Sequence, residues 1–189
     1  MAQNLTKVEV EKIQIEESVN YINFGLETER MIGITRGGSE FTVTNTVRDI
    51  EYDGRRGKTK GLQVIEAQEA KLKLTTICSS QENIALSIPG CEVTDQDGKI
   101  IIENGDNTVI AEADYLDNIT SFAKTLDGKY KKITVRNAMH EGAFTSKAQQ
   151  KAEGEIALEF DAHFNPYDVT EKIWRIEDID SIPVAQGGK

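Results

Sequence analysis

The sequence predicts a mainly β fold, a β-sandwich or partly closed barrel with one short flanking α-helix. Three observations support this prediction. Apolar and polar residues alternate with a period of two along many short runs, residues typical of tight turns separate these runs, and one stretch alone carries helix signals. The chain has 15 glycines and 3 prolines, which suits many tight turns. About ten strands are expected, a number typical of sandwiches and barrels.

Composition describes a globular, acidic chain. Hydrophobic residues make up 38% and charged residues 29% of the 189 residues, and the net charge is −10. Such a surface repels phosphate backbones, so ordinary nucleic-acid binding is disfavoured. Two cysteines are too few for a disulfide framework. The first residues lack the pattern of a signal peptide, and no apolar run is long enough to span a membrane.

The first third of the chain predicts a strand, a loop and a hairpin. Alternation from Val8 to Ile15, with a slip in register, indicates a bent strand. Residues 17–28 are polar and predict a loop. Two strands, 29–36 and 40–47, flank Gly37 and Gly38, and this pattern predicts a hairpin with a tight turn.

The middle of the chain predicts a long strand followed by the helix. Within residues 62–77, Ala70, Leu72 and Leu74 share one face, as in a half-buried strand. Ser79 and Glu82 form a capping-box pattern, and the helix is expected over about 79–88, before Pro89–Gly90.

The second half predicts further strands joined by turns. Strands are expected at 91–94, 99–103, 108–112, 118–125 and 131–137, with turns at 95–98, 104–107 and 126–129. The run 153–164 alternates most clearly, and its packed face is expected to hold Gly154, Ile156, Leu158, Phe160, Ala162 and Phe164. We therefore expect three segments: an N-terminal arm and loop over 1–28, a β domain over 29–168, and a C-terminal arm over 169–189.

The sequence contains no pattern typical of a catalytic or metal site. The stretch 54–61 (GRRGKTKG) ends like a phosphate-binding loop, but Tyr52 occupies the position that requires glycine, and a strand follows where the motif needs a helix. His140 and His163 are far apart in sequence and lack metal-ligand spacing. Asp95, Asp97 and Gly98 predict a turn and not a calcium loop. We expect no enzyme activity and no cofactor.

Two charged features of the sequence are candidates for binding another molecule. A basic loop protrudes from the acidic chain and is a candidate contact with an acidic partner; it comprises Asp53, Gly54, Arg55, Arg56, Gly57, Lys58, Lys60 and Gly61. The outward face of the run 153–164 is mostly acidic and includes Glu155, Glu159 and Asp161. Both features suit assembly better than catalysis.

The stretch from Gly33 to Leu74 resembles the tail tube (major tail) proteins of siphophages. The pattern consists of GITRGGSEFTV, then residues 48–54 (RDIEYDG), then RGKTKGLQVIEAQEAKLKLTTI. The segment ending in IPG at 88–90 and the run ITVRNAMHEG (133–142) with EIALEFDAHFNP (155–166) fit the same family. The resemblance covers roughly residues 30–168.

The resemblance implies hexameric rings that stack into a hollow tube, through which DNA passes during ejection without specific binding. By this analogy the basic loop bridges stacked rings, and Glu155, Glu159 and Asp161 line the lumen. Tail terminator, tape measure and distal tail proteins are the expected partners, with no membrane involved. The protein would be made in the host cytoplasm and located in the virion tail.

Three other interpretations stay open. A tube protein of a contractile tailocin or of a type VI secretion system would share the fold. A monomeric β-sandwich binding module would instead present an exposed aromatic platform, against which the aromatic content of 6% argues weakly. An enzyme is the remaining alternative.

Overall fold

The computed structural model describes residues 7, 11–14, 18–54, 56–106, 108–146 and 153–183. Ten strands carry the fold: β1 (Val19–Ile22), β2 (Arg30–Met31), β3 (Thr35–Asp49), β4 (Gln63–Thr76), β5 (Cys91–Gln96), β6 (Lys99–Asn104), β7 (Leu116–Lys124), β8 (Tyr130–His140), β9 (Ile156–Ala162) and β10 (Trp174–Ile179). A short helix, α2 (Gln81–Leu86), and a 3₁₀ turn, η1 (Glu112–Asp114), lie in the same ranges. No helix in these ranges is long and apolar enough to cross a membrane.

Eight strands form one antiparallel sheet that divides at β8. The order is β2-β1-β7-β8-β9-β4-β3, and β10 also pairs with β8. The first part of β8 pairs with β10 through Val135, and its last residues, from Ala138, pair with β9. Asn137 lies between these two stretches with a φ of 47°. Asparagine tolerates this left-handed conformation better than most residues, so the strand can change partners there.

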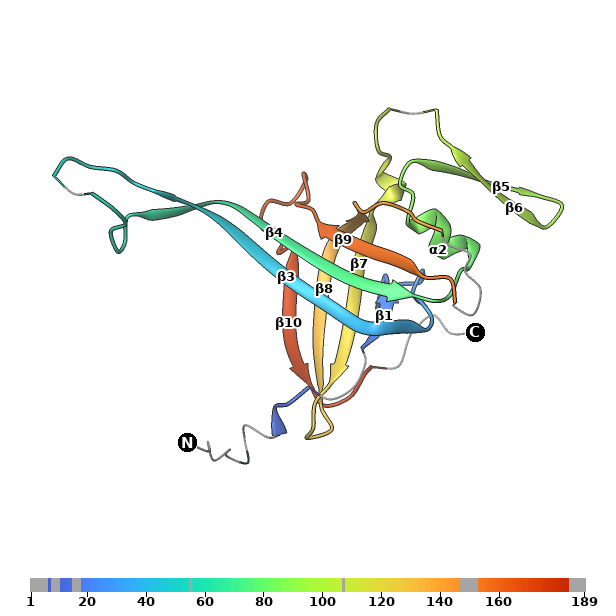
Figure 1. Cartoon of the computed structure of the whole chain (residues 1–189), viewed down its shortest axis with the longest axis horizontal. Helices are drawn as coiled ribbons and strands as arrows, with labels where there is room; N and C mark the ends of the chain where they lie inside the picture. Colours follow the sequence, from blue (N-terminus) through green and yellow to red (C-terminus); the bar gives the residue numbers. More distant parts are fainter. Residues whose placement is uncertain are drawn as a thin grey trace.

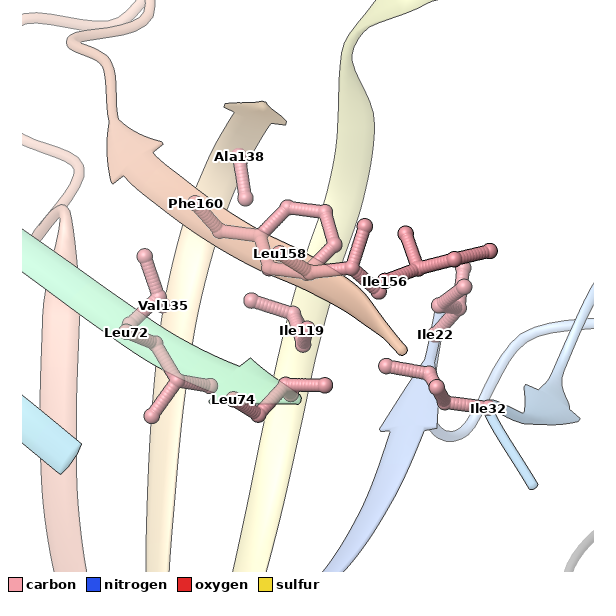
Figure 2. Close-up of a cluster of buried hydrophobic side chains, with 10 residues drawn as sticks. All are labelled: Ile22, Ile32, Leu72, Leu74, Ile119, Val135, Ala138, Ile156, Leu158 and Phe160. Atoms are coloured by element: carbon pink, nitrogen blue, oxygen red, sulfur yellow. The ribbon is translucent and has the colours of Figure 1, made fainter. Parts of the chain in front are cut away.

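The divided sheet forms two layers around an apolar core (Figure 1). Figure 2 shows Leu72 and Leu74 of β4 and Leu158 and Phe160 of β9 gathered over the strands β7 and β8. Ile119 and Val135 from those strands are fully buried in the same cluster; Ile22, Ile32, Ala138 and Ile156 complete it. The predicted mainly β class with a flanking helix is confirmed, and the sheet is open, as in a sandwich and not a closed barrel.

The predicted hairpin at Gly37–Gly38 is wrong, because β3 runs on through both glycines. Thr35 pairs with Thr76 and Ser39 pairs with Leu74, so β3 contains two more residues than β4 across this interval. Both glycines have positive φ, 78° and 74°. A β-bulge and a tight hairpin turn can both require residues with positive φ. Here the two glycines lie in a bulge, and β3 continues in the same direction along β4.

Three other segments differ from the predictions. Residues 19–22, expected in a loop, form β1 in the main sheet next to β7. The strand expected over 108–112 is absent among the described residues there, and η1 begins at Glu112. Residues 174–179, expected in a C-terminal arm, form β10 along β8. The bent strand expected over 8–15 falls largely outside the described residues.

The helix occurs where it was predicted, but its cap is Ser80 and not Ser79. The Ser80 hydroxyl accepts a hydrogen bond from the Asn83 backbone N–H at 3.3 Å. The buried Asn83 side chain donates to the backbone carbonyls of Ile32 (2.9 Å) and Cys78 (3.0 Å). These bonds fix α2 against the segment between β2 and β3 and against the residues that follow β4.

Two hairpins project from the body (Figure 1). The β3–β4 hairpin extends far to one side, and the β5–β6 hairpin forms a separate two-stranded sheet. The predicted turn between β5 and β6 is confirmed: Asp97 and Gly98 have positive φ, and Gly98 N–H donates to the Asp95 carboxylate at 2.8 Å. Figure 1 places these projections well away from the core.

Candidate assembly surfaces

The outer part of the β3–β4 hairpin, residues 44–69, is called the arm here. In β4, residues 71–76 also pair with β9 and Ala70 is buried, so the seven residues 63–69 lie beyond the body. At about 3.3 Å per residue, the paired part of the arm projects roughly 23 Å. Residues 44–48 and 63–67 are all exposed, so no other part of the described chain covers either face of this ribbon.

Polar side chains hold the two strands of the arm together. Gln68 donates to Asn45 at 2.9 Å, and Arg48 donates to Glu66 at 2.6 Å. Exposed cross-strand pairs of this kind contribute about 0.2–1 kcal/mol each. The arm therefore holds its shape by backbone pairing and surface contacts, without a core of its own.

Apolar side chains also lie on this uncovered ribbon. Val47 and Ile65 face each other across the strands and are 48% and 57% exposed. Ile50 and Tyr52 near the tip and Val64 are likewise exposed. Because an isolated two-stranded ribbon is marginally stable in water, such residues favour contact with another surface.

The tip of the arm carries the predicted basic loop. Gly54, Gly57 and Gly61 adopt positive φ and let the chain wind between the strands. Arg56, Lys58 and Lys60 are exposed. None of these three side chains forms an ion pair with another described residue. Asp53 is exposed beside them, and Arg55 lies outside the described residues.

The acidic face of β9 meets basic residues from its neighbours. Glu159 binds Lys71 and also Lys73, the latter at 3.0 Å. Asp161 lies 3.4 Å from Lys71. The hydrogen bond from Lys71 is the main reason that the pKa of the Glu159 carboxyl is lowered. This face is therefore a strip of alternating charge and not a uniformly acidic surface.

The remaining predicted acidic residue is paired in the same way. Glu155, just before β9, accepts a hydrogen bond from Arg36 at 2.7 Å. Sequence periodicity identified the faces of β4 and β9 separately. The ion pairs of Lys71 and Lys73 with β9 form because β4 and β9 are neighbours in the sheet. The sequence of one strand does not show which strand lies next to it.

One buried histidine lies behind this strip. His140 is 2% exposed, and its Nδ1 accepts a hydrogen bond from the Glu159 backbone N–H at 2.9 Å. Its Nε2 has no hydrogen-bond partner among the described residues. Burial lowers the pKa of His140, so the ring is neutral near pH 7. It is an acceptor that fixes the end of β8 to β9.

No group of three or more His, Cys, Asp and Glu residues that could hold a metal ion occurs within the described ranges. The grooves on this part of the molecule are lined by mixed polar and apolar side chains. The exposed ribbon and its basic tip are thus the features with the clearest potential for binding. No protein-family model matches the chain, and no curated protein matches it significantly.

Proposed function

We propose that this chain is a structural subunit that self-assembles into the tail tube of a long-tailed bacteriophage. The observation that carries the proposal is the arm, a ribbon uncovered on both faces that bears exposed Val47, Ile65 and Tyr52. A ribbon with so little internal burial gains stability when a second molecule covers it. A second copy of the same chain is the simplest partner for an assembly.

Free strand edges support the same proposal. Within the described chain, β3 pairs only with β4, and β10 pairs only with β8. Each thus has one row of backbone N–H and C=O groups without a strand partner. Such edges are templates for pairing between molecules, and ring closure removes them.

In the proposed tube, copies join through sheet edges into hexameric rings, and the arms link one ring to the next. The alternating charges of Lys71, Glu159 and Asp161 could line the inside of such a tube, as a uniformly acidic wall could. The paired carboxylates would hold Lys71 away from the DNA. DNA would then slide without specific binding.

Direct observation of the purified protein tests the proposal. Sedimentation velocity at tens of micromolar followed by negative-stain microscopy should show rings or long hollow tubes. A monodisperse monomer at all concentrations would refute self-assembly.

A binding module is the second candidate, and one observation favours it. Phe164 and Tyr167, in the loop after β9, are 61% and 89% exposed and lie beside a groove. Exposed aromatic rings of this kind can stack on sugars or peptides. A monomer that binds an immobilised glycan, and loses binding in Tyr167→Ala, would support this alternative.

A further inference from the structure

We infer that the arm tip of one copy docks into a groove on the body of the next copy, at the junction of β7 and the loop after β9. This inference rests on the proposed self-assembly and assigns the surface that receives the arm. The groove has a volume of about 560 Å³. Its walls include Ile110, Glu112, Tyr115, Asp117, Phe164 and Tyr167.

The groove combines apolar walls with unpaired acidic groups. Ile110, Phe164 and Tyr167 are exposed apolar side chains along it. Glu112 and Asp117 are exposed and have no side-chain hydrogen bond or ion pair within the described chain. A large exposed apolar patch with a polar rim is typical of a protein-binding surface.

Charge is segregated between the groove and the arm. Residues 100–123 contain five acidic residues, Glu103, Asp106, Glu112, Asp114 and Asp117, and no lysine or arginine. Residues 48–60 contain five basic and three acidic residues, a net charge of +2 in a chain of −10. The arm is therefore attracted to the groove of another copy, and complementary charge of this kind selects and orients partners.

The arm tip offers the same two kinds of group as the groove. Arg56 and Lys58 lack ionic partners among the described residues, while Ile50 and Tyr52 present exposed apolar surface at the same end. The cations match Glu112 and Asp117. The apolar side chains match the exposed rings of the groove.

The contact must join two molecules. The arm extends away from the body (Figure 1), and its paired strands are continuous from the core outward. Its tip therefore lies far from the groove of the same copy. An arm on one copy and a groove on the next is a heterologous contact, which propagates into a filament or closes into a ring.

Charge reversal on each side tests the inference. Glu112→Lys with Asp117→Lys should raise the concentration needed for assembly at least about tenfold, as should Arg56→Glu with Lys58→Glu, because like charges then face each other. Combining all four changes should restore assembly. The matched control, Lys99→Glu with Lys172→Glu, reverses two exposed basic residues outside the arm and should assemble as the unchanged protein does.

Cross-linking locates the contact. Lys58→Cys with Asp117→Cys should form an intermolecular disulfide on mild oxidation, identified by peptide mass spectrometry; Lys58→Cys with Lys172→Cys is the control. Circular dichroism of each variant verifies folding. Tubes that form while Lys58→Cys links elsewhere, for example near the facing pair Glu92 and Glu103, would overturn the docking site and leave the proposed function standing. A protein that never assembles would overturn both.

Discussion

Removal of the arm should abolish the stacking of rings into tubes and leave the body folded. Consider a variant in which Asn-Gly replaces residues 45–68 and joins Thr44 to Glu69, which face each other across β3 and β4. Asn-Gly is a favoured two-residue hairpin turn. The core residues Leu72 and Leu74 lie beyond the deletion and keep their partners on β9.

The expected change in stability is small because the losses and gains are similar. The deletion removes exposed cross-strand contacts such as Gln68–Asn45 and Arg48–Glu66, each worth about 0.2–1 kcal/mol. Shortening a connection of 24 residues to two lowers the entropy cost of closing it by about 2 kcal/mol. We therefore expect the free energy of unfolding to change by less than about 2 kcal/mol.

Two measurements separate the body from the assembly. Urea denaturation followed by circular dichroism gives the free energy of unfolding, and sedimentation velocity gives the assembly state. A body destabilised by more than about 3 kcal/mol would refute the reasoning that the arm has no part in the core. Tubes of normal length would refute the role of the arm as a contact between copies.

Three further predictions concern the body. Phe160→Ala should cost about 3–5 kcal/mol in urea denaturation, since the ring is fully buried between the layers, whereas Tyr167→Ala should stay within about 0.5 kcal/mol; equal effects would contradict the two-layer core. Because burial lowers the pKa of His140, the unfolded chain binds the proton first, so stability should fall as the pH is lowered below about 6.5. His140→Gln should flatten this dependence between pH 7.5 and 5.5, and an unchanged slope would exclude His140 as its source. Asn83→Ala should cost about 2–3 kcal/mol in the same assay, because two buried carbonyls lose their donor; an unchanged midpoint would show that they find other partners.

Much of the fold follows from local pattern. The alternation of Ala70, Leu72 and Leu74 correctly predicted the buried face of β4. The alternation of Ile156, Leu158 and Phe160 did so for β9, although Phe164, expected on the same face, lies after the strand and is exposed. In each case burial on one side of a strand leaves a period of two in the sequence. The turn at Asp97 and Gly98 was equally clear, since its backbone conformation restricts the residues allowed.

The failures have a common cause, which is that pairing is not local. Gly37 and Gly38 supply positive φ, which serves a bulge or a turn equally well, and only the partner strand decides between them. β1 is four residues long and contains Asn20 and Tyr21, so its pattern is too short to distinguish from a loop. The ion pair between Lys71 and Glu159 arises from strand order. The charge of the basic loop was evident from the sequence. The length of the arm that carries this loop was not.

The division of the sheet at Asn137 has a consequence for how the protein opens. Since β8 is hydrogen-bonded to β7, β9 and β10, neither layer can separate without breaking the ladder of that one strand. The body should unfold as a single cooperative unit, and the amide protons of β8 should exchange with solvent most slowly. The arm, with both faces in water, should exchange early and independently, so that one chain combines its most persistent and its most readily opened hydrogen bonds.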